Sequence, residues 1–167
     1  MVRSPEALEA PFNRYTDVVR PEWIDYSGHM NLGYYLLAFE EAATCFFGAG
    51  VADLGEAYRE RTGHALFAAE THITFDREVR AGDPLRFESH VLDATDKAID
   101  CMHLMYHGDD GYLAATNQLL YLHVDLDRRR VAAFGDEAQA RIDDWRDTHA
   151  ALPRPEQAGR AIGLRKS

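Results

Sequence analysis

The sequence predicts a single α+β domain in which one long apolar helix precedes a series of antiparallel strands. Residues 32–47 are too aliphatic and too many for a strand, so they predict a buried helix that is apolar around nearly its whole circumference. The later part of the chain holds runs with little helical periodicity, separated by turns rich in glycine and aspartate. A helix followed by consecutive antiparallel strands is typical of this fold class.

The other elements follow from local composition. A first strand is expected over residues 12–20, which are rich in valine, threonine and tyrosine, and a short helix over residues 53–62. In the run from 67 to 79, alternation places Phe67, Ile73 and Phe75 on one face. The remaining expected elements are strands at 85–92, 99–107 and 113–124, with Leu120, Leu122 and Val124 facing inward, and a helix at 137–149.

Composition places the chain among compact domains. Its 167 residues suit one domain, expected at 12–150, with a flexible leader at 1–11 and an extended basic tail at 151–167. The formal net charge of −10 argues against nucleic acid as a partner, and no apolar run approaches the roughly 20 residues of a membrane span. Cys45 and Cys101 lie in apolar segments without a spacing pattern, and the first residues do not form a secretory signal, which predicts a cytoplasmic protein.

Polar side chains are concentrated directly before the long helix, in Asp25-Tyr26-Ser27-Gly28-His29-Met30-Asn31. A helix start offers free backbone N–H groups and the positive end of a dipole, and a carboxylate lies one loop away. Together these groups could hold a carbonyl oxygen and attack its carbon. Asp25 and Asn31 could equally serve only as caps of the turn, as aspartate and asparagine often do.

This stretch, extended back to Val19, resembles the hot-dog acyl-CoA thioesterases of the 4-hydroxybenzoyl-CoA thioesterase type. The resemblance continues through Tyr34-Tyr35, residues 39–42 and 75–83, and ends near residues 123–125. It implies an antiparallel sheet wrapped around a central helix, and sites formed between two subunits of a homodimer or of a tetramer of dimers.

The resemblance also assigns roles to individual residues. Asp25 becomes the catalytic carboxylate, and the backbone N–H of Leu32 or Gly33 becomes the oxyanion donor. Glu40 on the helix is the reserve for Asp25, or a residue that orients the catalytic loop. The chain departs from the pattern in two places. Trp23 stands where many relatives carry a second acidic residue. Leu32 stands where some carry histidine or asparagine, so any role for that side chain is absent or moves to Asn31.

A narrower resemblance, in residues 65–75 and in the tail, is to the betainyl-CoA thioesterases of carnitine breakdown, which act beside or fused to a carnitine dehydrogenase. It implies hydrolysis of betainyl-CoA, whose product carries a trimethylammonium group. Aromatic rings could recognise this group by cation–π contact, although aromatic residues here are just as often ordinary core. The candidates for such a cage are Trp23, Tyr26, Tyr34 and Tyr35.

Further roles remain open between binding and structure. His29 is either a structural residue of the turn or a substrate contact, and Arg77 and Arg80 either meet coenzyme A phosphates or are solvated turn charges. A metal site is not expected, because His103 and His107 on a strand would lie roughly 13 Å apart, and no cofactor is implied beyond the substrate's own coenzyme A. The alternatives are a hot-dog dehydratase, whose histidine–aspartate signature is not found, and a non-catalytic acyl-CoA binding module.

Overall fold

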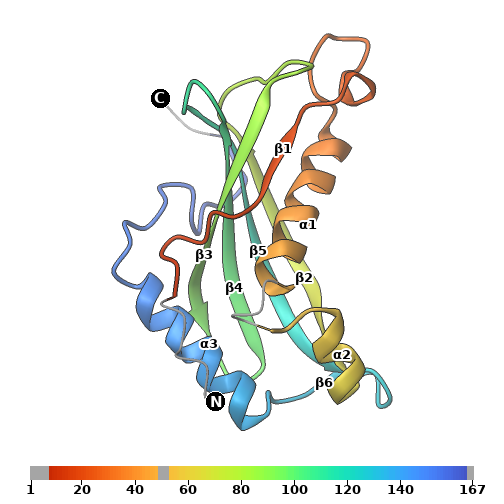
Figure 1. Ribbon diagram of the computed structural model, residues 1–167, viewed down its shortest axis with the longest axis vertical. Coiled ribbons are helices and arrows are strands. Elements are labelled where there is room, and N and C mark those ends of the chain that lie inside the picture. Colours follow the sequence, from red (N-terminus) through yellow and green to blue (C-terminus); the bar gives the residue numbers. More distant parts are fainter. Residues whose placement is uncertain (1–7, 49–52, 165–167) are drawn as a thin grey trace, which may run out of the picture.

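The computed structural model describes residues 8–48 and 53–164, and these form the predicted α+β domain (Figure 1). Residues 1–7 of the expected leader and 165–167 of the expected tail lie outside the described residues. The elements in chain order are β1 (Thr16–Val18), a 3₁₀ helix η1 (Pro21–Trp23), α1 (Leu32–Gly48), α2 (Glu56–Thr62), β2 (His64–Phe75), β3 (Pro84–Ala94), β4 (Ala98–His107), β5 (Leu113–Asp125), β6 (Arg130–Val131) and α3 (Asp136–His149).

The strands form one antiparallel sheet in the order β1-β3-β4-β5-β2, with β6 beside β5, and the sheet curls around α1 (Figure 1). The expected first strand at 12–20 is shorter in the structure. Only Thr16–Val18 pair continuously with β3, while Phe12 makes an isolated bridge to Ser89. The strand ends where Pro21 begins the 3₁₀ helix, because proline fixes φ and lacks a backbone donor.

Helix α1 buries one stripe of side chains against the inner face of the sheet. The stripe has helical spacing and consists of Tyr35, Ala38, Phe39, Ala42, Ala43, Phe46 and Phe47. The prediction of a helix buried around nearly its whole circumference is therefore wrong for the single chain. Leu32, Leu36 and Leu37 are exposed, with Leu32 keeping 61% of its accessible surface, because one curled sheet covers only one side of a helix.

Two predicted strand faces also differ from the structure. On β2, a bulge between Ala68 and Glu70 interrupts the alternation, and Phe67 and Phe75 are both exposed on this edge strand. On β5, the buried Leu119 belongs to the core cluster that also holds residues of α1, whereas Leu120 and Leu122 point to the other face and are only partly buried. Consecutive apolar residues leave the face undetermined, since a one-residue change exchanges the two sides of a strand.

A row of polar side chains crosses the sheet beneath α1. The Ser89 hydroxyl and His103 Nδ1 lie 2.8 Å apart, and Thr71 Oγ1 donates to Asn117 Oδ1 at 2.7 Å. His103 pairs in register with both Ser89 and Asn117 and is fully buried. Burial lowers the pKa of His103 to about 3, so the ring is neutral in the folded protein at pH 7.

This neutral histidine predicts a loss of stability in mild acid. Below its ordinary pKa of about 6.5, His103 takes up a proton in the unfolded chain but not in the folded one, so the free energy of unfolding falls with decreasing pH. We expect His103 to contribute a fall of about 1.2 kcal/mol between pH 6 and 5, measured by urea unfolding.

The variant His103→Asn should be less stable at pH 7 but should show a smaller fall toward pH 5. Phe46→Leu is the control, because the Phe46 ring packs 6.3 Å from the His103 ring and has no proton to exchange. It should lower stability equally at both pH values. An unchanged pH slope in His103→Asn would contradict this account.

Candidate active site

The loop before α1 is held in place by backbone hydrogen bonds at both of its ends. Asp25 N–H donates to His29 O at 2.9 Å, and Asn31 N–H donates to Trp23 O at 2.9 Å. Gly28 has a φ of +81°, a left-handed conformation that glycine adopts without strain. This hairpin-like loop delivers the chain directly into the first turn of α1.

Asp25 caps the loop through its Oδ1, and the His29 backbone also acts on the carboxylate. Its Oδ1 accepts the Ser27 N–H at 2.8 Å and also the Ser27 hydroxyl. The Ser27 hydroxyl and backbone N–H lower the pKa of Asp25, so the group is a carboxylate at neutral pH. The capping interpretation therefore holds for Oδ1, while the two hydrogen bonds from Ser27 leave Oδ2 unengaged.

Asn31 caps the helix in the same manner. Its Oδ1 accepts the Gly33 N–H at 2.9 Å, which is the usual N-cap bond. Since Gly33 already has a partner, Leu32 is the better of the two candidate oxyanion donors: its N–H meets no acceptor within residues 8–48 or 53–164. The capping bond also fixes the Asn31 amide, which leaves its Nδ2 free to donate.

A pocket of about 420 Å³ opens beside this helix start. Its lining is aromatic and acidic and consists of His29, Met30, Leu32, Tyr35, Phe75, Asp76, Arg77 and Glu78. The rings of Tyr35 and Phe75 meet edge to face with centroids 5.0 Å apart. His29 Nδ1 lies 3.0 Å from Glu78 Oε2, which ties the loop to the turn after β2. His29 therefore braces the loop and also lines the pocket, and its contact with a substrate stays a prediction.

The expected aromatic cage is only partly formed. Trp23 is 2% exposed, with Tyr34 stacked against it at 5.7 Å between ring centroids and the Arg20 guanidinium 4.8 Å from its ring. The Trp23 ring is covered by Tyr34 and Arg20 and is buried, so it cannot contact a substrate in this conformation. Its assignment as a cage residue is corrected to a core role. Tyr26 is fully exposed, and Tyr35 is the one expected ring that lines the pocket.

Sequence reasoning missed Phe75, Asp76 and Glu78 as pocket residues. They lie at the end of β2 and in the turn after it, more than 40 residues from the loop that they face. The alternation of β2 gave a signal for Phe75, whose ring shares a face with Ile73, but could not show that α1 leaves this ring uncovered. Phe75 keeps 54% of its accessible surface.

Of the two expected coenzyme-binding arginines, Arg77 lines the pocket, and Arg80 contacts Glu78, a residue of its lining. Arg77 stacks on the Tyr112 ring with 4.0 Å between the guanidinium carbon and the ring centroid. Arg80 Nη2 lies 3.2 Å from Glu78 Oε1, and the Arg80 backbone N–H donates to Asp83. Arg77 therefore lines the pocket, whereas the charge of Arg80 is partly engaged by Glu78.

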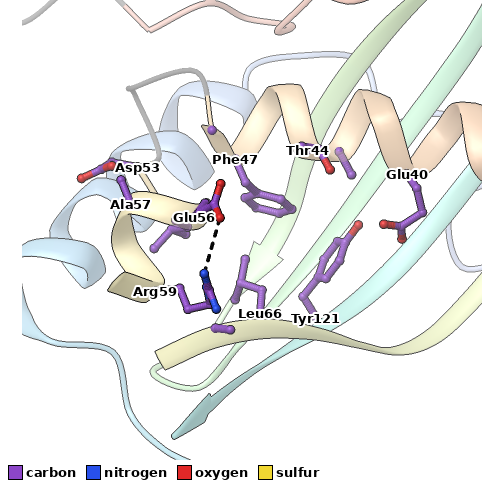
Figure 2. A pocket seen from close by; sticks show the side chains of 14 residues that line it. Glu40, Thr44, Phe47, Asp53, Glu56, Ala57, Arg59, Leu66 and Tyr121 are labelled. Carbon is purple, nitrogen blue, oxygen red and sulfur yellow. Dashed lines mark hydrogen bonds and ion pairs between the residues drawn. The ribbon is translucent and has the colours of Figure 1, made fainter. Parts of the chain in front are cut away.

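Glu40 lies in a different pocket of about 460 Å³, between α1, α2 and β2 (Figure 2). Its carboxylate points toward the hydroxyl of Tyr121, whose pKa is raised mainly by burial. Eight residues of helix separate Glu40 from Leu32, about 12 Å along the axis. Glu40 makes no hydrogen bond to the loop at 25–31 in the structure. It therefore does not orient that loop through a direct contact.

Two kinds of feature are absent from the described part of the chain. Residues 8–48 and 53–164 contain no group of three or more histidine, cysteine or acidic side chains placed to hold a metal ion. Among the same residues, no helix has the length and apolar character required to span a bilayer.

Comparison with known proteins identifies the family of the chain. Residues 19–142 match the model of the thioesterase-like superfamily, and the chain belongs to that family. It is 36% identical over 150 residues to a betainyl-CoA thioesterase of Pseudomonas aeruginosa, covering 90% of this chain and 93% of that protein. It is 35% identical to an L-carnitine dehydrogenase/betainyl-CoA thioesterase of Ruegeria pomeroyi, covering 93% of this chain but 31% of that longer protein.

Solved structures confirm the hot-dog fold. The protein SAV2348 of Staphylococcus aureus, determined in complex with CoA, superposes with a TM-score of 0.82 at 25% identity, covering 97% of this chain and 100% of that one. A putative thioesterase of Pseudomonas putida superposes with a TM-score of 0.77 at 25% identity, covering 93% and 98% of the two chains.

Proposed function

We propose that this protein is an acyl-CoA thioesterase that hydrolyses betainyl-CoA to betaine and coenzyme A. The observation that carries the proposal is an ionised carboxylate, Asp25, in the loop that leads into α1, where the Leu32 N–H has no acceptor among the described residues. The likeness to the betainyl-CoA thioesterase of Pseudomonas aeruginosa over nearly its whole length supports the substrate.

The chemistry requires water to replace the thiolate at the acyl carbon. Asp25 Oδ2 either takes a proton from the attacking water or attacks the carbonyl itself to form an anhydride that water then opens. In both routes the carbonyl oxygen becomes an oxyanion, which the Leu32 N–H and the helix dipole stabilise. The C–S bond breaks and the coenzyme A thiolate leaves and is protonated.

The lining of the pocket suits a trimethylammonium group. Tyr35 and Phe75 present aromatic rings, and Asp76 and Glu78 add carboxylates, against the single cation of Arg77. A quaternary ammonium cannot donate a hydrogen bond, so rings and nearby negative charge are the groups that recognise it. Phe75 and Tyr35 therefore replace Trp23 as the central rings of the proposed cage.

A second copy of the chain is part of the proposal. Strand β2 has 12 residues, and within the described residues its ladder runs along β5 alone. Beside this open edge lie Phe67, Phe75 and the exposed leucines of α1. Exposed edges and apolar patches favour association, so pairing of two β2 edges is the assembly we propose, as a dimer or as a tetramer of dimers.

The cellular setting belongs to the same proposal. The longer relatives carry a carnitine dehydrogenase in one chain with the thioesterase, as their names state. We place this protein beside such a dehydrogenase in the cytoplasm, where the free thiols of Cys45 and Cys101 would remain reduced.

Replacement of Asp25 by asparagine tests the catalytic carboxylate. Asparagine keeps an Oδ1 that can accept from Ser27, so the melting temperature should change little, while kcat for betainyl-CoA should fall at least about 100-fold. Thiol release and thermal unfolding measure the two effects. Glu40→Gln is the control, and a larger loss of kcat in that variant would move the catalytic role to α1.

The acyl group is tested by comparing betainyl-CoA with isovaleryl-CoA, a neutral substrate of equal size. A desolvated cation–π contact is worth about 2 kcal/mol, so kcat/KM should favour betainyl-CoA by roughly 30-fold. Phe75→Leu should reduce this preference more than it reduces turnover of isovaleryl-CoA. The matched control is Phe67→Leu, an exposed phenylalanine on the same strand that does not line this pocket. Equal kcat/KM on both substrates would exclude the betainyl assignment while leaving a thioesterase.

Assembly is tested by light scattering. The 18.9 kDa chain should have at least twice that mass at micromolar concentration, and Leu36→Glu should weaken association because it puts a charge on the exposed face of α1. A wild-type monomer would contradict the proposed dimer.

A further inference from the structure

The segment after α3 is fastened to the sheet at two points, one of which is a residue of the candidate active site. Gln157 is 9% exposed, and its Nε2 donates to Asp76 Oδ1 at 3.2 Å. Gly159 N–H donates to Gln118 Oε1 at 2.7 Å, and Gln118 is itself held by both carboxylate oxygens of Asp100. The segment thus has a defined position although it forms no helix or strand.

One of these two points is part of the pocket itself, since Asp76 lines it. The turn continues directly from that point, because Arg160 N–H donates to Gln157 O at 3.2 Å. Figure 1 shows the segment returning along the sheet toward the end at which α1 begins. Arg160 is exposed and forms no ion pair with any residue in 8–48 or 53–164.

The pocket cannot supply the charge that a coenzyme A thioester needs. It contains two carboxylates and one arginine, and Arg80 beside it is paired with Glu78. The whole chain carries a formal net charge of −10. Arg77 is held on the Tyr112 ring, but it stands against two carboxylates in the lining, so we expect the coenzyme phosphates to need a further cation outside the acyl pocket.

We propose that the turn at residues 155–160 binds a phosphate of the coenzyme A part of the substrate, with Arg160 as the contact and Gln157 as a positioning residue. The proposal rests on the thioesterase function proposed above. Arginine suits this role because its guanidinium donates paired hydrogen bonds to phosphate oxygens. The contact of Gln157 with Asp76 sets the turn at the mouth of the pocket, where the pantetheine arm would emerge.

The test compares two thioesters of betaine, one with coenzyme A and one with N-acetylcysteamine, which has no phosphate. A hydrogen bond to a charged group is worth about 1.5 kcal/mol or more. Arg160→Ala should therefore lower kcat/KM for the coenzyme A thioester, relative to that for the N-acetylcysteamine thioester, about tenfold. The change should appear in KM for the coenzyme A thioester, and should shrink at high salt.

Arg154→Ala is the matched control. Arg154 lies on the same segment, and its replacement removes the same charge. Its charge acts on the Asp100 carboxyl instead: burial raises the pKa of Asp100, and the nearby Arg154 charge opposes this rise. This variant should leave the ratio unchanged. Gln157→Ala should lower the ratio in the same direction as Arg160→Ala, because the turn loses its connection to Asp76.

Equal effects of Arg154→Ala and Arg160→Ala would show a general effect of net charge and overturn the proposal. A loss in Arg160→Ala that is the same for both thioesters would also overturn it, because it would mean a structural role. Calorimetric titration with coenzyme A needs no turnover. If the wild-type protein hydrolysed neither thioester, the proposed function would fail, and a weaker affinity for coenzyme A in Arg160→Ala alone would still support the turn as a phosphate site.

Discussion

The burial of a single stripe of α1 against the curled sheet is the constraint on which the rest of the structure depends. Phe39 and Phe46 are almost fully buried, and each such side chain stabilises its position by about 1.5–3 kcal/mol. Rotation of the helix about its axis would expose them, so the direction of every other residue on α1 is fixed. The helix orientation fixed in this way turns Leu32 and Leu36 outward. It also sets the direction of the first helical turn relative to the loop that holds Asp25. The chain before η1 and this loop is joined to the sheet, because Val19 N–H donates to Asp83 O at 2.9 Å and Gly82 N–H donates to Val19 O at 2.8 Å.

The proposed substrate makes two opposite electrostatic demands, since a cationic acyl group is joined to an anionic coenzyme. The charges that would meet them come from different segments. Asp76 and Glu78 lie in the pocket together with Arg77, whereas Arg160, the proposed phosphate contact, lies on the segment after α3. Asp76 belongs to both regions, because it lines the pocket and accepts a hydrogen bond from Gln157. A single carboxylate therefore connects the proposed recognition of the acyl group with the proposed recognition of the phosphates.

Local sequence was sufficient to predict the helix start and the capping residues, because these depend on neighbouring groups. The predicted helix at 32–47 differs from α1 by one residue, and the bonds of Asp25 and Asn31 span two residues each. Features that depend on distant segments were not predictable in the same manner. The exposure of Phe67 follows from a bulge and from the position of β2 at the sheet edge. The burial of Trp23 follows from its stacking with Tyr34 and Arg20, which a pattern of aromatic residues cannot distinguish from an open cage. The choice of Leu32 over Gly33 required the Asn31 capping bond to be seen.

The difference between features set by neighbouring residues and features set by distant segments has a functional consequence. The groups proposed to act on the thioester, Asp25 and the Leu32 N–H, come from one short segment whose hydrogen bonds are local. The groups proposed to select the acyl chain and the coenzyme, among them Phe75 and Gln157, come from the sheet edge and from the far end of the chain. Because few direct contacts join the two sets, apart from that of His29 with Glu78, substitutions in the selective set can change substrate preference with little disturbance of the carboxylate. His29 is the exception: its ring is the contact through which a change at Glu78 would reach the loop that positions Asp25.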